Sequence, residues 1–296
     1  MKPQGYFARG GPTRFAFQLG KYSPPRGGRL LAGLAARILV TLKLPIYHNV
    51  YDNQRHVLGP EVSPKELRRQ VYRVLFNAGL AYYELFHNVG RGRLRVDEFV
   101  PPVRLLPETA TYIQEALDCG RGVFLIGCHT ANFDLGGMAL SQFLAVPMQA
   151  LSLADPPDGY ELFNDLREQG GAMVTPITPA TLREAMRRLQ SGGLVITGVD
   201  RPTGQDDQPV EFFGATAHLP TGYIRIPLRT DSLVIVLASF YADGAYHLAA
   251  NPPLEMLRTD DRAQDVTVNS QRVLAQIEEF IRRYPDQWMM FERVWK

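Results

Sequence analysis

The residues most able to do chemistry lie in the segment 127–134, where His129 is followed five positions later by Asp134. A neutral imidazole can take a proton from a hydroxyl group, and a nearby carboxylate can fix its tautomer and stabilise the imidazolium that forms. Residues five apart on one α-helix lie about 140° apart round the axis, so this pair cannot share a helical face. We therefore expect His129 at a strand end or turn, and Asp134 in the first turn of the next helix.

The flanking sequence predicts that layout. An apolar run at 123–126 is typical of a buried strand, Thr130 and Asn132 are candidate N-cap residues, and residues 135–140 favour a helix. The chain has a second pair with the same spacing, His56 and Glu61, but it spans Gly59-Pro60 and has no strand before it, which indicates a loop. A purely structural role is the alternative for His129.

A second apolar run, at 193–199, ends at Asp200 and Arg201. In open α/β sheets ligands bind at the carboxyl ends of the strands, so His129, Asp200 and Arg201 are expected to converge on one cleft. Charges at the end of a buried strand cost stability unless they are paired or used. The alternative is a local ion pair between Asp200 and Arg201 that closes a loop.

Strands and helices alternate along the chain, which predicts an α/β fold: a single domain with a mostly parallel central sheet flanked by helices. Further strands are expected at 147–153, 172–177 and 232–240, and further helices at 64–87, 108–117, 160–169, 181–189 and 265–284. Residues 212–222, rich in aromatics, glycine and proline, suggest a rigid loop near the cleft.

Taken in order, four blocks resemble the bacterial lipid A biosynthesis acyltransferase family, which includes phosphatidylinositol mannoside acyltransferases and belongs to the lysophospholipid acyltransferase superfamily. They are the His-x-x-x-x-Asp block at 129–134, Gly-Val-Asp-Arg at 198–201, the Phe-Phe-Gly to Pro-Thr-Gly block at 212–222, and Pro-Asp-Gln-Trp at 285–288. Many lipid A members have Glu where this chain has Asp134, a clear N-terminal transmembrane helix and a histidine near the C-terminus. These departures bear on the acceptor rather than on the chemistry.

The resemblance implies a glycerolipid acyltransferase-like fold and a membrane-associated O-acyltransferase that moves a fatty acyl chain from acyl-CoA or acyl carrier protein to a glycolipid or lysophospholipid hydroxyl. We expect His129, Asp134, Asp200 and Arg201 to be catalytic, with His129 as general base and Asp134 orienting it; Asp200 orients either His129 or Arg201. Arg201 binds the oxyanion or a phosphate. The residues expected to bind substrate are Asn132, Phe212, Phe213, Thr221 and Arg225.

Composition narrows the alternatives. Of 296 residues, 45% are hydrophobic and 21% charged, as in ordinary globular proteins, and the two cysteines have neither metal-ligand spacing nor a disulfide framework. Phosphate-binding glycine motifs and a nucleophile elbow are missing. We expect no metal, and no cofactor besides the acyl donor. Cys128 adjoins His129, but neighbours on a strand point to opposite faces, so it is expected to be a packed apolar residue.

The N-terminal segment 1–46 is predicted to be a basic arm and an interfacial helix, before an acyltransferase domain at 47–296. Residues 1–51 contain eight Lys or Arg and no Asp or Glu, and residues 1–28 are expected to be loosely ordered. The apolar run from residue 29 is interrupted by Arg37 and Lys43, so it suits a helix lying on a membrane better than one crossing it. We expect an anionic membrane surface as partner, at the cytoplasmic face of the bacterial plasma membrane, and no nucleic acid. An arm packed on the domain, or one that binds nucleic acid, is the alternative.

Two other functions stay open. A thioester hydrolase would use the same residues with water as acceptor, and a non-catalytic peripheral lipid-binding protein would keep the fold without needing His129.

Overall fold

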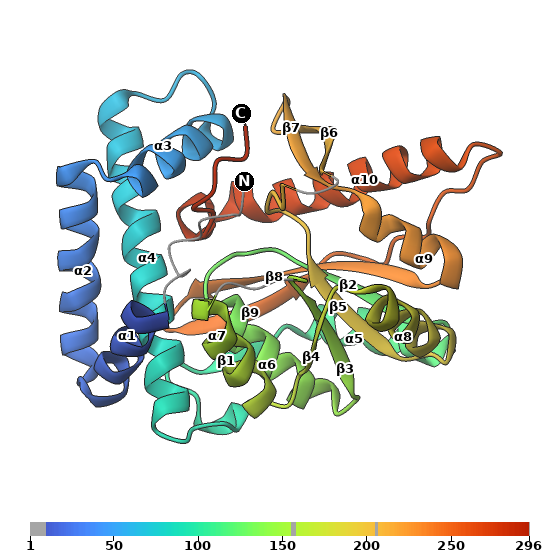
Figure 1. The fold of residues 1–296 in the computed structure, drawn as a ribbon, viewed down its shortest axis with the longest axis horizontal. Coiled ribbons are helices and arrows are strands. Elements are labelled where there is room, and N and C mark those ends of the chain that lie inside the picture. The colour runs from blue at the N-terminus through green and yellow to red at the C-terminus, as the bar shows by residue number, and fades with distance from the viewer. Residues whose placement is uncertain (1–9, 155–157, 205–206, 296) are drawn as a thin grey trace.

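The computed structural model describes residues 10–154, 158–204 and 207–295; Lys2 and Arg9 of the predicted basic arm lie outside the described residues. Its centre is a seven-stranded sheet of order β1-β9-β8-β2-β5-β3-β4 (Figure 1). The strands are β1 (Val103–Leu105), β2 (Val123–Gly127), β3 (Met148–Ser152), β4 (Met173–Pro176), β5 (Leu194–Gly198), β8 (Leu233–Ala242) and β9 (Ala245–Ala250).

Five neighbouring strands of this sheet run in the same direction. β2 pairs in parallel with both β8 and β5, and β3 pairs in parallel with both β5 and β4. β9 is antiparallel to β8 and parallel to β1, so these two strands run the opposite way. The prediction of a mostly parallel sheet is confirmed. Gly127 and Gly198 are register partners, which brings the residues after β2 and β5 to the same edge.

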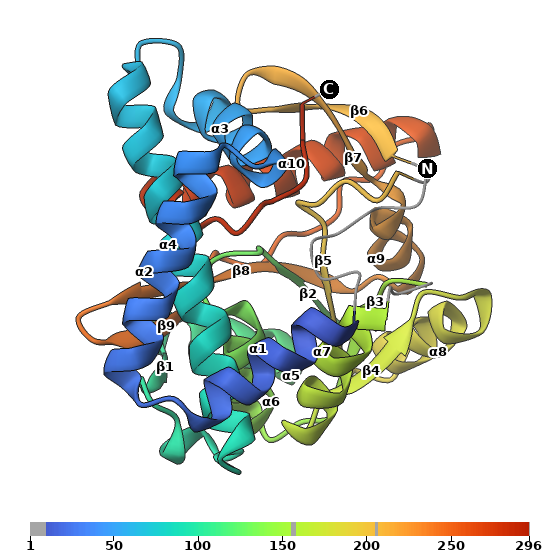
Figure 2. The ribbon, with the colours of Figure 1, turned by 60° about the vertical axis from the view of Figure 1, so that its left-hand side comes forward.

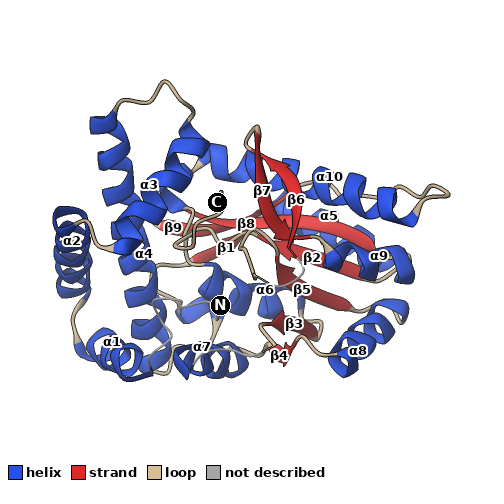
Figure 3. Ribbon diagram, turned by 45° about the horizontal axis from the view of Figure 1, so that its top comes forward, coloured by secondary structure: helices blue, strands red, loops and turns tan. Residues whose placement is uncertain are grey.

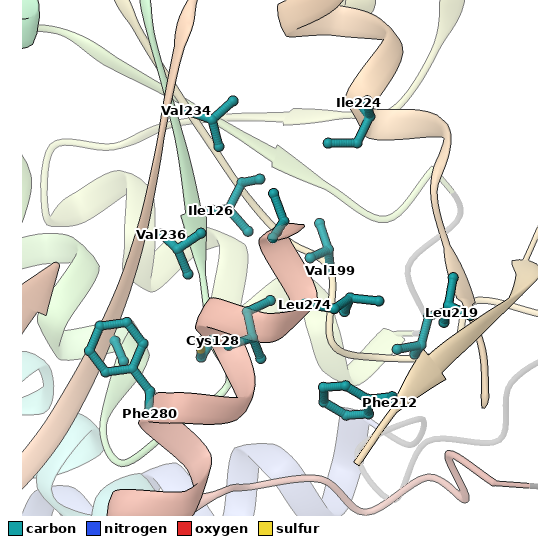
Figure 4. Close-up of a cluster of buried hydrophobic side chains, with 14 of the residues drawn as sticks. Ile126, Cys128, Val199, Phe212, Leu219, Ile224, Val234, Val236, Leu274 and Phe280 are labelled. Atoms are coloured by element: carbon teal, nitrogen blue, oxygen red, sulfur yellow. The ribbon is translucent and has the colours of Figure 1, made fainter. Parts of the chain in front are cut away.

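Helices cover both faces of the sheet. The helices of the described residues are α1 (Gly10–Tyr22), α2 (Pro25–Leu42), α3 (Pro45–Leu58), α4 (Pro64–Gly90), α5 (Pro107–Asp118), α6 (Phe133–Leu144), α7 (Asp158–Gln169), α8 (Pro179–Gln190), α9 (Arg225–Thr230) and α10 (Arg262–Arg283). Phe124 and Ile126 of β2 pack into a core shared with α8, α9 and α10. Figure 4 shows Ile126 in this core together with Leu274 and Phe280 of α10. Val123 and Leu125 pack into the opposite core with α4, α5, α6 and α7, as the period of two along a strand requires.

The first helices form a layer of their own on α4. Figures 1 and 2 place α1 and α2 together at one side of the molecule. Small residues let α2 approach α4 closely: a Cβ on Gly28 would lie 2.3 Å from Cζ of Tyr83. Ala36 and Val40 share a buried cluster with Val71 of α4. Within the described residues, no single helix is long and apolar enough to span a membrane, although the bent pair α2 and α3 passes together on length and composition.

Two segments differ from expectation. Residues 10–22, predicted to be loosely ordered, form the helix α1. Residues 207–220 form the antiparallel hairpin of β6 (Asp207–Phe212) and β7 (Ala215–Pro220), separate from the main sheet (Figure 3). Most of the rigid loop predicted at 212–222 is therefore part of a hairpin. The physical reason is an alternation of buried side chains along both strands, which lets one face of the hairpin pack on α10.

Candidate active site

His129 lies two residues beyond the end of β2, in a turn held by the C-terminal segment. Its carbonyl accepts from the backbone N–H of Met289 at 2.8 Å, and the carbonyl of Gln287 accepts from the N–H of Ala131 at 2.7 Å. Ala131 has φ of 48°, the left-handed conformation that makes the turn sharp. Asn132 then caps α6, its side-chain oxygen accepting from the N–H of Leu135 at 3.2 Å.

The carboxylate that contacts the imidazole is Asp200, just after β5. Nδ1 of His129 lies 2.5 Å from Oδ1 of Asp200, and the backbone N–H of His129 donates to Oδ2 at 3.0 Å. The indole N–H of Trp288 donates to the same Oδ2 at 2.9 Å. Because Nδ1 faces a carboxylate, it carries the proton in the neutral ring, and Nε2 is left as the acceptor.

Asp200 is fully buried, yet it stays ionised. Burial on its own would raise the pKa of this carboxyl. The charge of His129, with the hydrogen bonds from His129 and Trp288, outweighs burial and holds the pKa of Asp200 below its ordinary value. A buried carboxylate with this set of donors can both orient an imidazole and stabilise the imidazolium.

Asp134 occupies the predicted first turn of α6, but its partner is not His129. Its Oδ1 accepts from Nε of Arg167 on α7 at 2.7 Å, and its side chain is 5% exposed. The prediction that Asp134 orients His129 is therefore wrong for this structure. The prediction relied on the short spacing between His129 and Asp134 in the sequence. In the structure, the parallel pairing of β2 with β5 brings Asp200 to Nδ1 of His129 instead.

A cavity of about 230 Å³ opens beside His129. His129, Asp134, Arg167 and Arg201 all line it. The remaining lining is largely apolar, and includes Met138, Met148, Ala150, Leu151, Ile177, Ile196, Leu237 and Leu248. Polar groups thus meet an apolar chamber at one end of the sheet, which suits a ligand with a reactive polar end and a hydrocarbon tail.

Arg201 points to this cavity rather than to Asp200. Its guanidinium donates to the hydroxyl of Tyr160, and its Nε lies 3.6 Å from Oε2 of Glu292. Burial would lower the pKa of Arg201, but Tyr160 and Glu292 outweigh burial and raise it. The buried Nε of Arg201 and Oε2 of Glu292 have no hydrogen-bond partner among the described residues.

Three glycines, two at strand ends and one on α6, leave space for the imidazole and for a ligand. A Cβ on Gly198 would lie 2.7 Å from Cε1 of His129, so a larger residue there would displace the ring. Gly137 of α6 lines the cavity, and nothing lies within 4 Å of the position its Cβ would take. The same is nearly true of Gly127, whose nearest neighbour would be 3.9 Å away.

With this geometry in place, comparison with known proteins identifies the family. The family profile of the bacterial lipid A biosynthesis acyltransferases matches residues 60–296. The chain belongs to this family. It is an acyltransferase, and the family acts on lipids.

Relatives of known name agree with the family. The chain is 24% identical over 293 residues to the phosphatidylinositol mannoside acyltransferase of Mycolicibacterium smegmatis, covering 92% of this chain and 93% of that protein. It is 23% identical over 187 residues to the Mycobacterium tuberculosis protein of the same name, covering 62% and 58%. A solved structure, the 1-acyl-sn-glycerophosphate acyltransferase PlsC of Thermotoga maritima, matches 87% of this chain and 98% of its own at 14% identity and a TM-score of 0.35.

Residues of the four family blocks are joined by contacts around Asp200 and Trp288. His129 and Asp200 come from the first two blocks, and Trp288 of the last block donates to Asp200. Phe212 of the third block packs edge-on to Trp288, with ring centroids 6.1 Å apart, and stacks on Trp295 at 5.6 Å. The blocks that carry the family resemblance thus form one continuous support for the imidazole.

The five residues predicted to bind substrate lie outside the cavity. Asn132 is a buried helix cap that also donates to the carbonyl of Ala81. Phe212 belongs to the aromatic core, and Phe213 lies under the guanidinium of Arg282. Thr221 is buried before α9, and Arg225 is exposed at the start of that helix. None of the five is among the described residues that line the cavity around His129.

Four residues of the site were assigned no role from the sequence: Tyr160, Arg167, Trp288 and Glu292. The first two lie on α7, in a segment correctly predicted to be a helix, but nothing in its pattern shows which turn faces the cavity. Trp288 was recognised only as part of a family block.

The surroundings of Cys128 do not support a cysteine nucleophile. Burial raises the pKa of the Cys128 thiol well above its ordinary value, which disfavours a thiolate nucleophile. Among the described residues, no cluster of three or more His, Cys, Asp or Glu side chains could hold a metal ion.

Proposed function

We propose that this enzyme transfers a fatty acyl chain from an acyl thioester to a hydroxyl of a glycolipid or lysophospholipid, with His129 as the general base. The observation that supports this most directly is the contact between Nδ1 of His129 and buried Asp200, at the polar end of an apolar cavity. Asp200 fixes the tautomer, so Nε2 is the atom that takes the acceptor's proton.

The reaction needs no covalent enzyme intermediate. The acceptor oxygen attacks the thioester carbonyl while its proton passes to Nε2 of His129. The tetrahedral intermediate then collapses, the C–S bond breaks, and the leaving thiolate takes the proton back from the imidazolium. General-base catalysis of this kind contributes about 10²–10⁴-fold in rate.

Arg201 supplies positive charge at the cavity. Its Nη1 donates to the hydroxyl of Tyr160, and its Nε lies 3.6 Å from Oε2 of Glu292. We assign to it the oxyanion of the intermediate or a phosphate of the donor or acceptor. Loss of one oxyanion donor typically costs about 10²–10³-fold in rate.

Asp134 acts through Arg167 instead of through His129. The pair joins the first turn of α6 to α7 across the cavity, and both side chains line it. Removing one partner of an ion pair leaves the other as an unpaired buried charge. A substitution of Asp134 or of Arg167 will therefore disturb the cavity wall.

The apolar part of the cavity is the site we propose for the acyl chain. A hydrocarbon tail gains roughly 0.8 kcal/mol for each methylene group that leaves water. The donor is acyl-CoA or acyl carrier protein, and no further cofactor is required.

The acceptor class follows from the relatives. Two proteins named phosphatidylinositol mannoside acyltransferase align with this chain, one of them over nearly its whole length. A glycolipid acceptor is therefore our first choice, and a lysophospholipid the second.

Membrane association is part of this proposal. Leu30, Leu34, Ile38 and Leu42 form an exposed aliphatic stripe on α2, with 75%, 55%, 45% and 64% of each residue accessible. Basic residues flank the stripe, including Arg26, Arg29 and Lys43. Such a helix suits the interface of an anionic bilayer, at the cytoplasmic face of the bacterial plasma membrane where acyl thioesters are made.

The experiment is thiol release from palmitoyl-CoA with and without a total polar lipid extract of the source cells, followed by mass spectrometry of the lipids. Release that needs the extract, with one lipid gaining the mass of an acyl chain, is the expected result and names the acceptor. Release without the extract would indicate a hydrolase instead. If neither donor, palmitoyl-CoA nor palmitoyl-acyl carrier protein, is consumed, the non-catalytic lipid-binding alternative is favoured.

A further inference from the structure

A second hollow lies far from His129, between the C-terminal half of α2 and the first turns of α4. It is an open groove of about 310 Å³. The residues that line it are Arg37, Val40 and Thr41 of α2 and Lys65, Arg68, Arg69 and Tyr72 of α4. Arg68 and Tyr82 of the catalytic cavity are fourteen residues apart on α4, which is about 21 Å of helix.

The groove gathers four cationic side chains: Arg37, Lys65, Arg68 and Arg69. All four are exposed, and none forms an ion pair with another described residue. Among the described residues, none of those that line the groove is acidic. Four like charges on facing helices repel one another, so a bound anion would relieve that repulsion as well as gain its own attraction.

The groove also borders the aliphatic stripe of α2. At 100° per residue, Arg37 points within about 20° of Leu30, and Thr41 lies about as far on the other side. A bilayer that receives the stripe therefore brings its phosphate groups to the mouth of the groove. Free phosphate or a nucleotide would have no use for the neighbouring aliphatic side chains.

We propose that this groove binds the phosphate headgroup of one anionic phospholipid and so fixes how the enzyme sits on the membrane. The proposal rests on the membrane association in the proposed function, but not on its chemistry. Arginine is suited to the task because its planar fork donates two hydrogen bonds to one phosphate.

The test is co-sedimentation of the full chain with vesicles of phosphatidylcholine, with or without phosphatidylglycerol. The double variant R68Q/R69Q should bind anionic vesicles about thirtyfold more weakly, the equivalent of about 1 kcal/mol for each charge, and neutral vesicles as wild type does. R37Q, on the facing helix, should show the same selectivity with a smaller loss. Thermal melting of each variant checks that the fold is kept.

The matched control is R183Q/R187Q, which removes two exposed charges from α8, outside the groove. An equal loss in the control would show that only overall charge matters, and would overturn the site. So would unchanged binding by R68Q/R69Q, or wild type that binds neither kind of vesicle.

Two further results would distinguish a lipid headgroup from free phosphate, and the headgroup site from the proposed function. In the first, inorganic phosphate raises the melting temperature of wild type but not that of R68Q/R69Q, while both proteins bind vesicles equally well. That result would assign the groove to a free phosphate and overturn the lipid assignment. Wild type that transfers no acyl chain, but binds vesicles in a groove-dependent way, would contradict the proposed function and leave the headgroup site standing.

Discussion

Nδ1 of His129 and Oδ1 of Asp200 are 2.5 Å apart although 71 positions separate the two residues in the chain. The same carboxylate accepts the backbone N–H of His129 and the indole N–H of Trp288, so three donors from two segments converge on it. This convergence fixes the imidazole in one tautomer and one orientation before any substrate arrives.

The first prediction separates Asp200 from Asp134. D200N keeps the shape of the side chain but removes its charge and the correct tautomer of His129, so kcat should fall by up to about 10⁴-fold, the loss that the same change causes in the serine protease triad. D134N should cost less, because it breaks the pair with Arg167 and not the contact to His129. Steady-state kinetics of both variants measure the difference.

R167Q is the control for this pair. It should reproduce the effect of D134N, and the double variant D134N/R167Q should lose little more than either single one. If D134N lowers kcat as much as D200N does while R167Q leaves kcat unchanged, then Asp134 acts on His129 in the working enzyme and our assignment is wrong.

Much of this site could be predicted from the sequence, because its strands are apolar runs. Those at 123–126, 193–199 and 232–240 correspond to β2, β5 and β8, and the residues that follow the first two are His129 and Asp200. The rule that ligands bind at the carboxyl ends of parallel strands then brings them together. The choice between Asp134 and Asp200 was beyond the sequence, because it depends on strand register and on Trp288.

Other features depend on partners that local pattern does not reveal. Phe212 and Phe213 were expected to bind substrate because a loop near the cleft was expected there, but stacking on Trp295 draws Phe212 into the core. Strand β9 (Ala245–Ala250) has only a weak strand pattern in its sequence. It forms because β8 and β1 pair with it on its two sides. Helix α1 packs on α4, and no feature of the α1 sequence predicts this contact.

The second prediction concerns the acyl chain. G137L should place an isobutyl group in the open space off α6, so kcat/KM for long-chain donors should fall by at least about tenfold while short-chain donors are unaffected. Leucine also removes the helix penalty of glycine, about 0.8–1 kcal/mol, so stability should not suffer. A series of acyl-CoA donors of increasing length measures the effect.

G222L is the matched control, since Gly222 is exposed, outside the cavity, and has open space at its Cβ position. It should leave the chain-length profile as in wild type. Loss of activity with every donor in G137L, or no change with any, would show that the acyl chain does not use this part of the cavity.

The third prediction is a dependence of stability on pH through Glu84. Burial raises the pKa of Glu84 from 4.5 to about 7, although the hydroxyl of Tyr246, which donates to it, acts in the opposite direction. Between these values the folded protein keeps a proton that the unfolded chain has lost. The free energy of unfolding should therefore decrease as pH rises through this window, by roughly 3 kcal/mol in total.

Urea unfolding across that window measures the slope. E84Q cannot ionise, so its free energy of unfolding should lose most of this pH dependence. E66Q, an exposed position on the same helix, should keep it. A slope that is the same in wild type and E84Q would show that Glu84 titrates at its ordinary value.

The fourth prediction concerns Trp288. W288F keeps an aromatic ring beside Phe212 but loses part of the fully buried indole and its hydrogen bond to an ionised carboxylate; the bond alone typically contributes about 1.5–3 kcal/mol. We expect the free energy of unfolding to drop by an amount of that order, and kcat to fall more than KM changes. W295F, which instead loses a bond to the carbonyl of Phe212, should lower stability without the selective loss of kcat.

The central claim is that His129 is the base, and the most direct measurement is acyl transfer by H129A. Its rate should be compared with that of wild type, using palmitoyl-CoA or palmitoyl-acyl carrier protein and the lipid extract, with thermal melting as the check on folding. We predict a folded protein whose transfer rate is lower by about 10²–10⁴-fold. A folded variant that transfers acyl chains within about tenfold of wild type would contradict the account.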